Sequence, residues 1–135
     1  MPVLRELVRT YQAFASYDAA GYQGTGLTVP QADVIFTLGN TDGLNFREIG
    51  ELTLITKGTL TGVVDRLEGK GLVKRCSDPR DGRGTVVRLT RKGEQLFESL
   101  FPAQVKYIKQ RFDRLSRKEL EEVHTALKKL HAIFL

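Results

Sequence analysis

The residues best suited to chemistry in this sequence are hydroxyls and cations that gather in its middle third. Three threonines and two glycines lie among residues 56–62, and Arg80 and Arg83 lie in a predicted turn. Hydroxyls, backbone amides near a helix start and guanidinium groups are common ligands of phosphate oxygens. A surface that binds a polyanion is therefore the first chemistry that the sequence suggests.

The distribution of charge supports this interpretation. The chain has 135 residues and a net charge of +5. Residues 57–92 carry ten basic and four acidic side chains, whereas residues 1–56 have a net charge of −3 and residues 93–135 a net charge of +2. Runs of charge also occur as solvated surface, but a basic block that outweighs the whole chain is typical of a nucleic-acid footprint.

No arrangement for catalysis accompanies these residues. The sequence has no glycine-rich phosphate loop after a strand, no Gly-x-Ser-x-Gly elbow and no histidine–glutamate metal helix. His124 and His131 are seven residues apart, which is too far for adjacent chelation from one helix. We therefore predict a protein that is not an enzyme and that needs no cofactor or metal.

Cysteine use and hydropathy indicate the compartment. A single cysteine, Cys76, excludes an intrachain disulfide framework and favours a reducing environment, so we expect a cytoplasmic protein. No apolar stretch approaches the length of a membrane span, and the N-terminus has no signal-peptide pattern. Lys74 and Arg75 would favour the thiolate of Cys76, which keeps a redox-responsive regulator as an alternative to an incidental strand residue.

Hydrophobic periodicity and cap signals predict the elements that position the Thr56 run. An amphipathic helix is expected over residues 3–19. Thr28 with Gln31, and Asn45 with Glu48, predict capping boxes that open two short helices.

The second of these short helices is expected to turn Ile49 and Leu52 inward. After a brief interruption, a further helix should start at Thr56 and end at Gly69 or Gly71. Its apolar rear face is predicted to comprise Leu60, Val63, Val64 and Leu67.

A change of period then indicates a β-hairpin. Residues 72–76 and 85–90 are rich in β-branched side chains, and residues 77–84 between them are turn formers and charges. Arg80 and Arg83 would lie at a basic tip, where Asp81 could hold an arginine in place.

Two long helices should follow the hairpin. The first is expected to bend at Pro102, and the second opens with a capping box of Ser116 and Glu119. The first and last helices of the chain carry broad apolar faces, and the C-terminal residues are too apolar to end freely in water. We predict that these faces form a dimer, with contacts from Leu4, Leu7, Val8, Tyr11, Leu127, Leu130 and Phe134.

Two short helices joined by a tight interruption and followed by a basic hairpin describe a winged helix-turn-helix, in a mainly α (α+β) fold. One helix enters the major groove and the other braces it against the phosphate backbone. The predicted DNA contacts from the inserted helix are Thr56, Lys57, Gly58, Thr59, Thr61, Gly62, Asp65 and Arg66. The predicted contacts from the wing are Lys74, Arg75, Arg80, Asp81, Arg83 and Arg88.

Three segments in this order resemble the MarR family of transcriptional regulators: residues 55–75, 78–83 and 89–93. The resemblance implies a single MarR-like domain over residues 1–135, with a winged helix-turn-helix at about 28–90 and dimerisation helices at about 1–20 and 91–135. It further implies a homodimeric repressor that binds a pseudo-palindromic DNA operator. Release by a small aromatic or phenolic effector is also implied.

Two further interpretations remain open from the residues alone. Tyr11, Tyr17 and Tyr22 could line a pocket for such an effector, although tyrosines are more often core or interface residues. A winged-helix module that binds protein, without specific DNA binding, is the alternative to a DNA-binding regulator.

Overall fold

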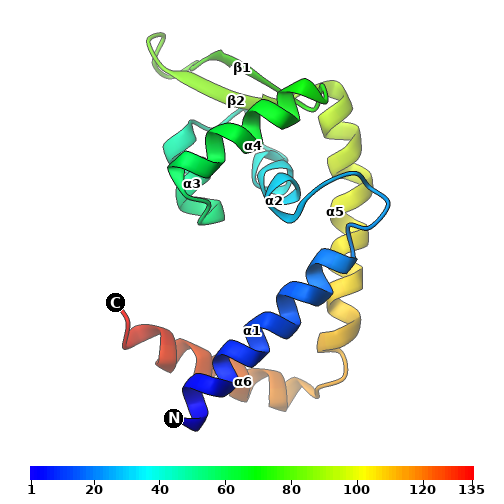
Figure 1. Ribbon diagram of the computed structural model, residues 1–135, viewed down its shortest axis with the longest axis vertical. Coiled ribbons are helices and arrows are strands. Elements are labelled where there is room, and N and C mark those ends of the chain that lie inside the picture. Colours follow the sequence, from blue (N-terminus) through cyan, green and yellow to red (C-terminus); the bar gives the residue numbers. More distant parts are fainter. The chain divides into compact units, whose positions relative to one another are not determined.

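The computed structural model describes residues 1–135 as six helices and one two-stranded sheet (Figure 1). The chain divides into two compact units, residues 1–102 and residues 103–135, and each is described by itself. The elements in chain order are α1 (Pro2–Ala20), α2 (Val29–Leu38), α3 (Phe46–Thr53), α4 (Lys57–Gly69), β1 (Val73–Ser77), β2 (Thr85–Leu89), α5 (Arg91–Phe112) and α6 (Arg117–Ala132).

Reciprocal caps fix the starts of three helices, as the sequence predicts. Thr28 and Gln31 close a capping box on α2, Asn45 and Glu48 close one on α3, and Ser116 with Glu119 does the same on α6. Each box satisfies two backbone N–H groups that a helix start would otherwise leave unpaired. These three boundaries therefore follow from residues at most three positions apart.

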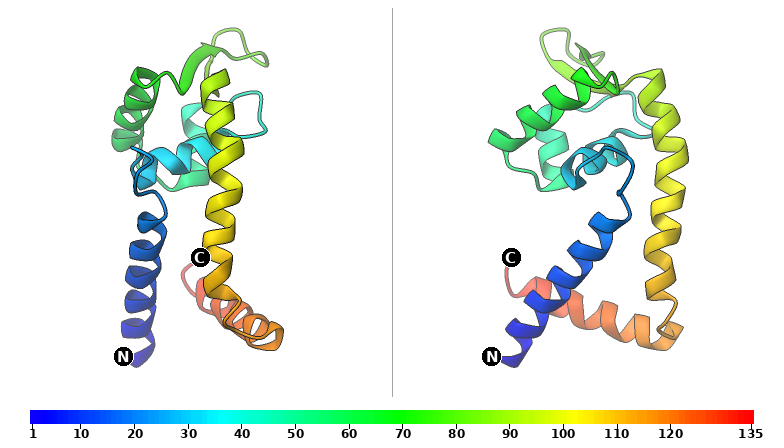
Figure 2. Two further views of the ribbon diagram at one scale, coloured as in Figure 1. Left: turned by 90° about the vertical axis from the view of Figure 1, so that its right-hand side faces the viewer. Right: turned by 45° about the vertical axis from the view of Figure 1, so that its right-hand side comes forward.

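The core lies where α2, α3 and α4 pack together beneath the hairpin (Figure 2). The rear face predicted for α4 is confirmed, because Leu60, Val63, Val64 and Leu67 are all buried. The other large side chains that are fully buried come from α2, α3 and the hairpin, and they are Val34, Ile35, Leu38, Ile49, Val73, Val86 and Val87.

The prediction for Leu52 is wrong. Ile49 is fully buried, but Leu52 is 66% exposed. Phe46, Ile49 and Thr53 define the covered side of α3, and at ~100° per residue Leu52 lies roughly 100° away from the centre of that side. The helix has only eight residues and packs on α2 and α4, so this narrow face is the one that they cover.

The predicted hairpin is confirmed with bounds shifted by one residue. β1 and β2 pair antiparallel, with Val73 opposite Leu89 and Ser77 opposite Thr85. Leu44, in the turn before α3, adds an isolated bridge to Val87 that the sequence did not indicate. This bridge ties the hairpin to the helix-turn-helix through the backbone.

A close junction joins α4, β1 and the start of α5. Just after the C-cap of α4, Gly71 lies in the left-handed region at φ +72°, and the Leu72 amide donates to the Leu67 carbonyl. The Thr90 hydroxyl donates to the Gly71 carbonyl at 2.6 Å and accepts the Gly93 amide at 3.1 Å. A Cβ at Gly93 would lie 2.0 Å from the Leu72 carbonyl oxygen, so only glycine permits this approach.

The outer helices expose their apolar side chains. α1 and α6 contain no buried residue, and α5 runs through Pro102. The bend expected at this proline stays a prediction. The exposed large apolar residues of α1 and of residues 103–135 include Leu4, Leu7, Val8, Tyr11, Phe14, Val105, Phe112, Leu115, Val123, Leu127, Ile133 and Phe134.

Candidate nucleic-acid interface

One face of α4 is polar, exposed and unoccupied by the rest of the chain. Lys57, Thr59, Thr61 and Arg66 are exposed, and they lie opposite the buried rear face. A Cβ built at Gly58 or at Gly62 would meet no atom within 4 Å. No intramolecular contact therefore requires either glycine, and the two positions leave the helix backbone open to a ligand.

The start of α4 differs from the capped helices. Thr56 is the N-cap residue, but its side chain caps no backbone amide and instead donates to the Thr59 hydroxyl at 3.1 Å. The first backbone N–H groups of α4 therefore have no side-chain partner. They form the positive end of the helix dipole, which favours binding of an anion such as a phosphate. The starts of α2, α3 and α6 are closed by side-chain caps, whereas the starts of α4 and α1 are not.

The wing tip is a structured turn held by Asp78. The Asp78 carboxylate, 8% exposed as a residue, accepts the Arg80 amide at 2.8 Å and the Arg80 guanidinium at 3.2 Å. These bonds, led by that from the Arg80 amide, lower the pKa of Asp78 below its ordinary value. Asp81, for which we predicted the holding role, accepts the backbone amide of Arg83 at 3.1 Å.

A second ion pair joins the wing tip to α3. Arg80 Nη2 donates to Glu48 Oε1 at 2.7 Å, and the same oxygen accepts the Asn45 amide of the capping box at 3.3 Å. The hydrogen bond from Arg80 lowers the pKa of Glu48, and pairing with Glu48 and Asp78 raises the pKa of Arg80. Arg80 therefore braces the wing, while Arg83 is exposed and forms no ion pair.

Arg75 is likewise engaged within the protein. Its guanidinium bonds Asp65 and Glu68 of α4, both at 2.6 Å, and lies 5.6 Å from the centroid of the Phe46 ring. These contacts, the hydrogen bond to Asp65 first, raise the pKa of Arg75. Two residues that we predicted as DNA contacts, Arg75 and Asp65, are thus partners that fix β1 against α4.

The predicted contacts also include five exposed cations without an ion pair. Lys74 and Arg88 face each other across the hairpin register and are both exposed, as are Lys57, Arg66 and Arg83. Their contact with DNA stays a prediction. The sequence did not indicate the role of Asp78 or the pairing of Glu48 with Arg80. The Asp-Pro pair was a turn signal for the first, but nothing in the sequence could place Glu48 beside a residue 32 positions away.

Known proteins with similar sequences and structures support this assignment of a helix-turn-helix and a basic wing. A model of the MarR family matches residues 25–84. The transcriptional regulator MhqR of Bacillus subtilis is 30% identical over 92% of this chain and 86% of its own length. The chain belongs to the MarR family.

Two solved structures extend the match over nearly the whole chain. A probable transcriptional regulator from Pseudomonas aeruginosa is 34% identical, with a TM-score of 0.75 over 92% of each chain. BpsR of Bordetella bronchiseptica is 26% identical, with a TM-score of 0.82 over 96% of this chain and 92% of its own. This MarR-family protein is therefore a DNA-binding transcriptional regulator and not an enzyme.

Two further observations bear on the environment of this MarR-family regulator. None of its helices combines the length and hydropathy needed to cross a membrane. Cys76 is half-buried in β1 and lies opposite Val86, with a free thiol.

Proposed function

We propose that this MarR-family regulator binds a pseudo-palindromic operator as a homodimer and represses transcription in the cytoplasm. In this proposal α4 enters the major groove, with Thr56, Thr59, Thr61 and Arg66 toward DNA, and Arg83 reaches the adjacent minor groove. The observation that carries the proposal is the free face of α4. The start of α4 has no side-chain cap, and Gly58 and Gly62 on this face have no internal packing role.

The homodimer rests on the outer helices. α1 and α6 bury no residue in the single chain, although Leu7, Val8 and Leu127 are among their large apolar side chains. Phe134, just after α6, is also exposed. Apolar surface of this extent is usually covered by a partner. We propose that residues 1–20 and 91–135 form the dimerisation region of one MarR-like domain, whose winged helix-turn-helix spans about 28–90. Two-fold symmetry would then place two copies of α4 roughly 34 Å apart, in successive major grooves.

An aromatic cluster in residues 1–102 supports a small aromatic effector. Phe36 lies 6.1 Å from Tyr22 and 5.2 Å from Phe101, and Phe97 stacks on Phe101 at 5.2 Å between ring centroids. Of the three tyrosines that we predicted for an effector pocket, Tyr22 is buried in this cluster and Tyr11 is 69% exposed.

A polar group sits beside these rings. A cavity of about 300 Å³ is lined by Asp33, Phe36, Thr37, Leu52 and Thr53. Burial, followed by the charge of Asp18, raises the pKa of Asp33 above its ordinary value of 3.8. In the similar protein BpsR, 6-hydroxynicotinic acid regulates DNA binding, which is consistent with an effector of this chemical class here.

Electrophoretic mobility shift on random duplex DNA, at low and at high salt, tests DNA binding directly. We expect binding at low salt that weakens several-fold as salt rises, because neutralising phosphates releases counterions. Selection of genomic fragments would then identify the operator. Absence of binding at low salt would contradict the proposal and favour a winged-helix module that binds protein.

A further inference from the structure

A carboxylate, that of Asp65, lies near the centre of the exposed face of α4. At ~100° per residue, Gly58, Gly62 and Asp65 lie within roughly 30° of the direction opposite to the buried side chains of the helix. The two glycines carry no side chain, so Asp65 is the side chain closest to the centre of this face. An acidic group is unexpected at this position, because phosphates repel it wherever the face meets DNA.

The protein holds Asp65 by one oxygen and leaves the other one free. Arg75 Nη2 donates to Asp65 Oδ1 at 2.6 Å, and Arg75 Nη1 donates to Glu68 Oε1 at 2.6 Å. Oδ2 of Asp65 accepts no hydrogen bond from the protein, and the side chain is 58% exposed. An ionised carboxylate has no donor, so Asp65 presents one free hydrogen-bond acceptor to a molecule that meets this face.

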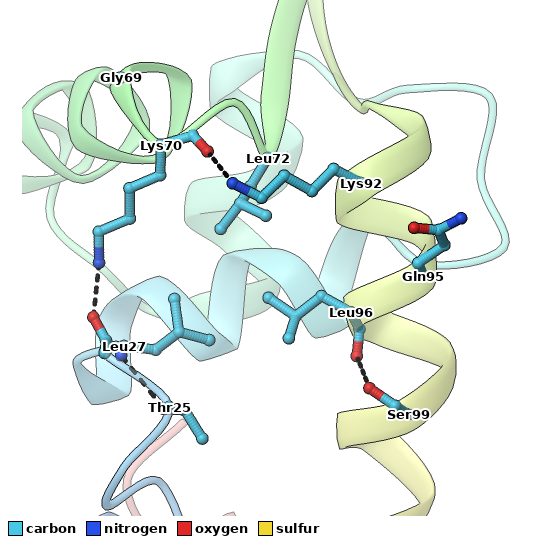
Figure 3. Close-up of a pocket in the computed structure, with 10 residues that line it drawn as sticks. Thr25, Leu27, Gly69, Lys70, Leu72, Lys92, Gln95, Leu96 and Ser99 are labelled. Carbon is cyan, nitrogen blue, oxygen red and sulfur yellow. Dashed lines mark hydrogen bonds between the residues drawn. The ribbon is translucent and has the colours of Figure 1, made fainter.

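The elements around Asp65 fix its orientation. The Arg75 guanidinium lies 5.6 Å from the centroid of the Phe46 ring, so α3, β1 and α4 meet beside this ion pair. The C-terminal end of α4 is also held, because Lys70 Nζ donates to a carbonyl of the α1–α2 loop and Lys92 Nζ donates to the Lys70 carbonyl at 3.0 Å (Figure 3). A side chain oriented in advance loses little conformational entropy on binding, which favours a selective contact.

The base edges of the major groove differ in what they offer to such an acceptor. Guanine shows two acceptors there, thymine shows an acceptor and a methyl group, and adenine shows an acceptor beside its amino donor. Cytosine shows only the amino donor at N4, and carboxylates pair with this group. A free acceptor without a donor therefore matches cytosine better than the other three bases.

We infer that Asp65 is a specificity-determining residue that accepts a hydrogen bond from N4 of a cytosine in the operator, with Arg75 as its positioning residue. This inference rests on the proposed entry of α4 into the major groove. It adds the identity of one base that the helix reads and the atom that reads it.

Asp65→Asn tests the inference because it reverses the hydrogen bonding at the free atom. Arg75 requires an acceptor, so the asparagine oxygen stays on Arg75 and the NH2 group, a donor, replaces Oδ2. In selection from a pool of random duplexes, we expect the wild type to select a cytosine where the variant selects a base with acceptors, guanine first. On duplexes that differ only at this position, the wild type should favour cytosine about tenfold, and the variant should lose that preference.

Two further variants separate reading of the base from structural support. Asp65→Ala, which has no polar group, should lose the preference for cytosine without gaining another. Glu68→Gln is the matched control, because it also removes one negative charge and one partner of Arg75, but Glu68 lies roughly 90° from the centre of the exposed face. Asp65→Asn and Glu68→Gln should both bind random duplexes more tightly than the wild type, since each removes a charge that repels phosphates. Glu68→Gln should nevertheless select the same bases as the wild type.

An unchanged base preference in Asp65→Asn and Asp65→Ala, or the same change of preference in Glu68→Gln, would overturn the inference. Thr61→Ala distinguishes this failure from that of the proposed function. If Thr61→Ala alters the base preference and Asp65→Asn does not, only the role of Asp65 is wrong. If neither variant alters it, the proposed entry of α4 into the major groove is wrong as well.

Discussion

At the scale of single residues, Gly62 bears on the proposal that the free face of α4 contacts DNA. Gly62 lies in the interior of a helix, where glycine is unfavourable, and a side chain added there would meet nothing in the protein. The stability lost at this position has no intramolecular compensation. It is explained if a DNA backbone or base edge approaches the helix closely at this point.

Gly62→Ala should therefore have opposite effects on folding and on binding. We expect the free energy of unfolding to rise by about 0.5–1 kcal/mol in urea denaturation, because alanine favours the helix. Affinity for operator DNA, measured by fluorescence anisotropy, should fall. Gly69→Ala is the control, because a Cβ there also meets nothing within 4 Å. An unchanged DNA affinity for Gly62→Ala would contradict close approach.

Thr61 and Arg83 should divide the work of recognition. Arg83→Ala is expected to weaken binding to all duplexes by a similar factor, because in our proposal this residue contacts phosphates and responds to groove width. Thr61→Ala should change the preference between operator variants, with shifts of about 1–3 kcal/mol at individual base pairs. If competition assays found no altered preference for Thr61→Ala, α4 would not be the element that reads the sequence.

At the scale of elements, the wing and α3 form one unit through Arg80. The guanidinium joins Asp78 in the turn at the wing tip to Glu48 in the capping box of α3, and the Leu44–Val87 bridge is a second connection between the hairpin and the segment that leads into α3. A wing that is already ordered loses less conformational entropy when it binds DNA. These intramolecular contacts therefore favour DNA binding even though they do not contact DNA themselves.

Acidification should release this connection. The folded state lowers the pKa of both Glu48 and Asp78 below their ordinary values of 4.5 and 3.8. Carboxylates with a lowered pKa stabilise the fold above the ordinary value, and this stabilisation is lost as the pH falls through the lowered one. We therefore expect the free energy of unfolding of the wild type to fall more between pH 6 and about pH 2 than that of Arg80→Ala, because the variant lacks the guanidinium that pairs with Glu48 and Asp78. Parallel curves for the two proteins would disprove the role of Arg80.

At the scale of the whole molecule, the prediction is a dimer. Sedimentation equilibrium should give a mass twice that of one chain, because α1 and α6 leave broad apolar surface without an internal partner. Leu127→Glu places a charge on the apolar face of α6 and should weaken association at least about tenfold. Thr125→Glu, also exposed on α6, serves as the control. A wild-type protein that sediments as a single chain would contradict the dimer and with it the spacing of the two reading helices.

The sequence determined most of the features that depend on neighbours along the chain. Each capping box joins two residues three positions apart, the rear face of α4 repeats at helical spacing, and the hairpin follows from β-branched runs around a turn. The charged block and the three family segments are also linear, so the winged helix-turn-helix and its DNA-binding function could be predicted from them. Such features need no knowledge of which segments meet.

Only the tertiary structure decided which residues serve the protein itself. Arg80 and Arg75 are of a residue type that often binds DNA. Each is nevertheless held in an ion pair with a residue distant in the sequence, Arg80 with Glu48 across 32 positions and Arg75 with Asp65 across 10. Leu52 has the spacing of a core residue, but it lies beyond the part of α3 that its neighbours cover. The hydrogen bond from Lys70 to the Gly26 carbonyl likewise exists only because the end of α4 meets the α1–α2 loop. In each case the partner is distant along the chain, and periodicity carries no information about contacts between elements.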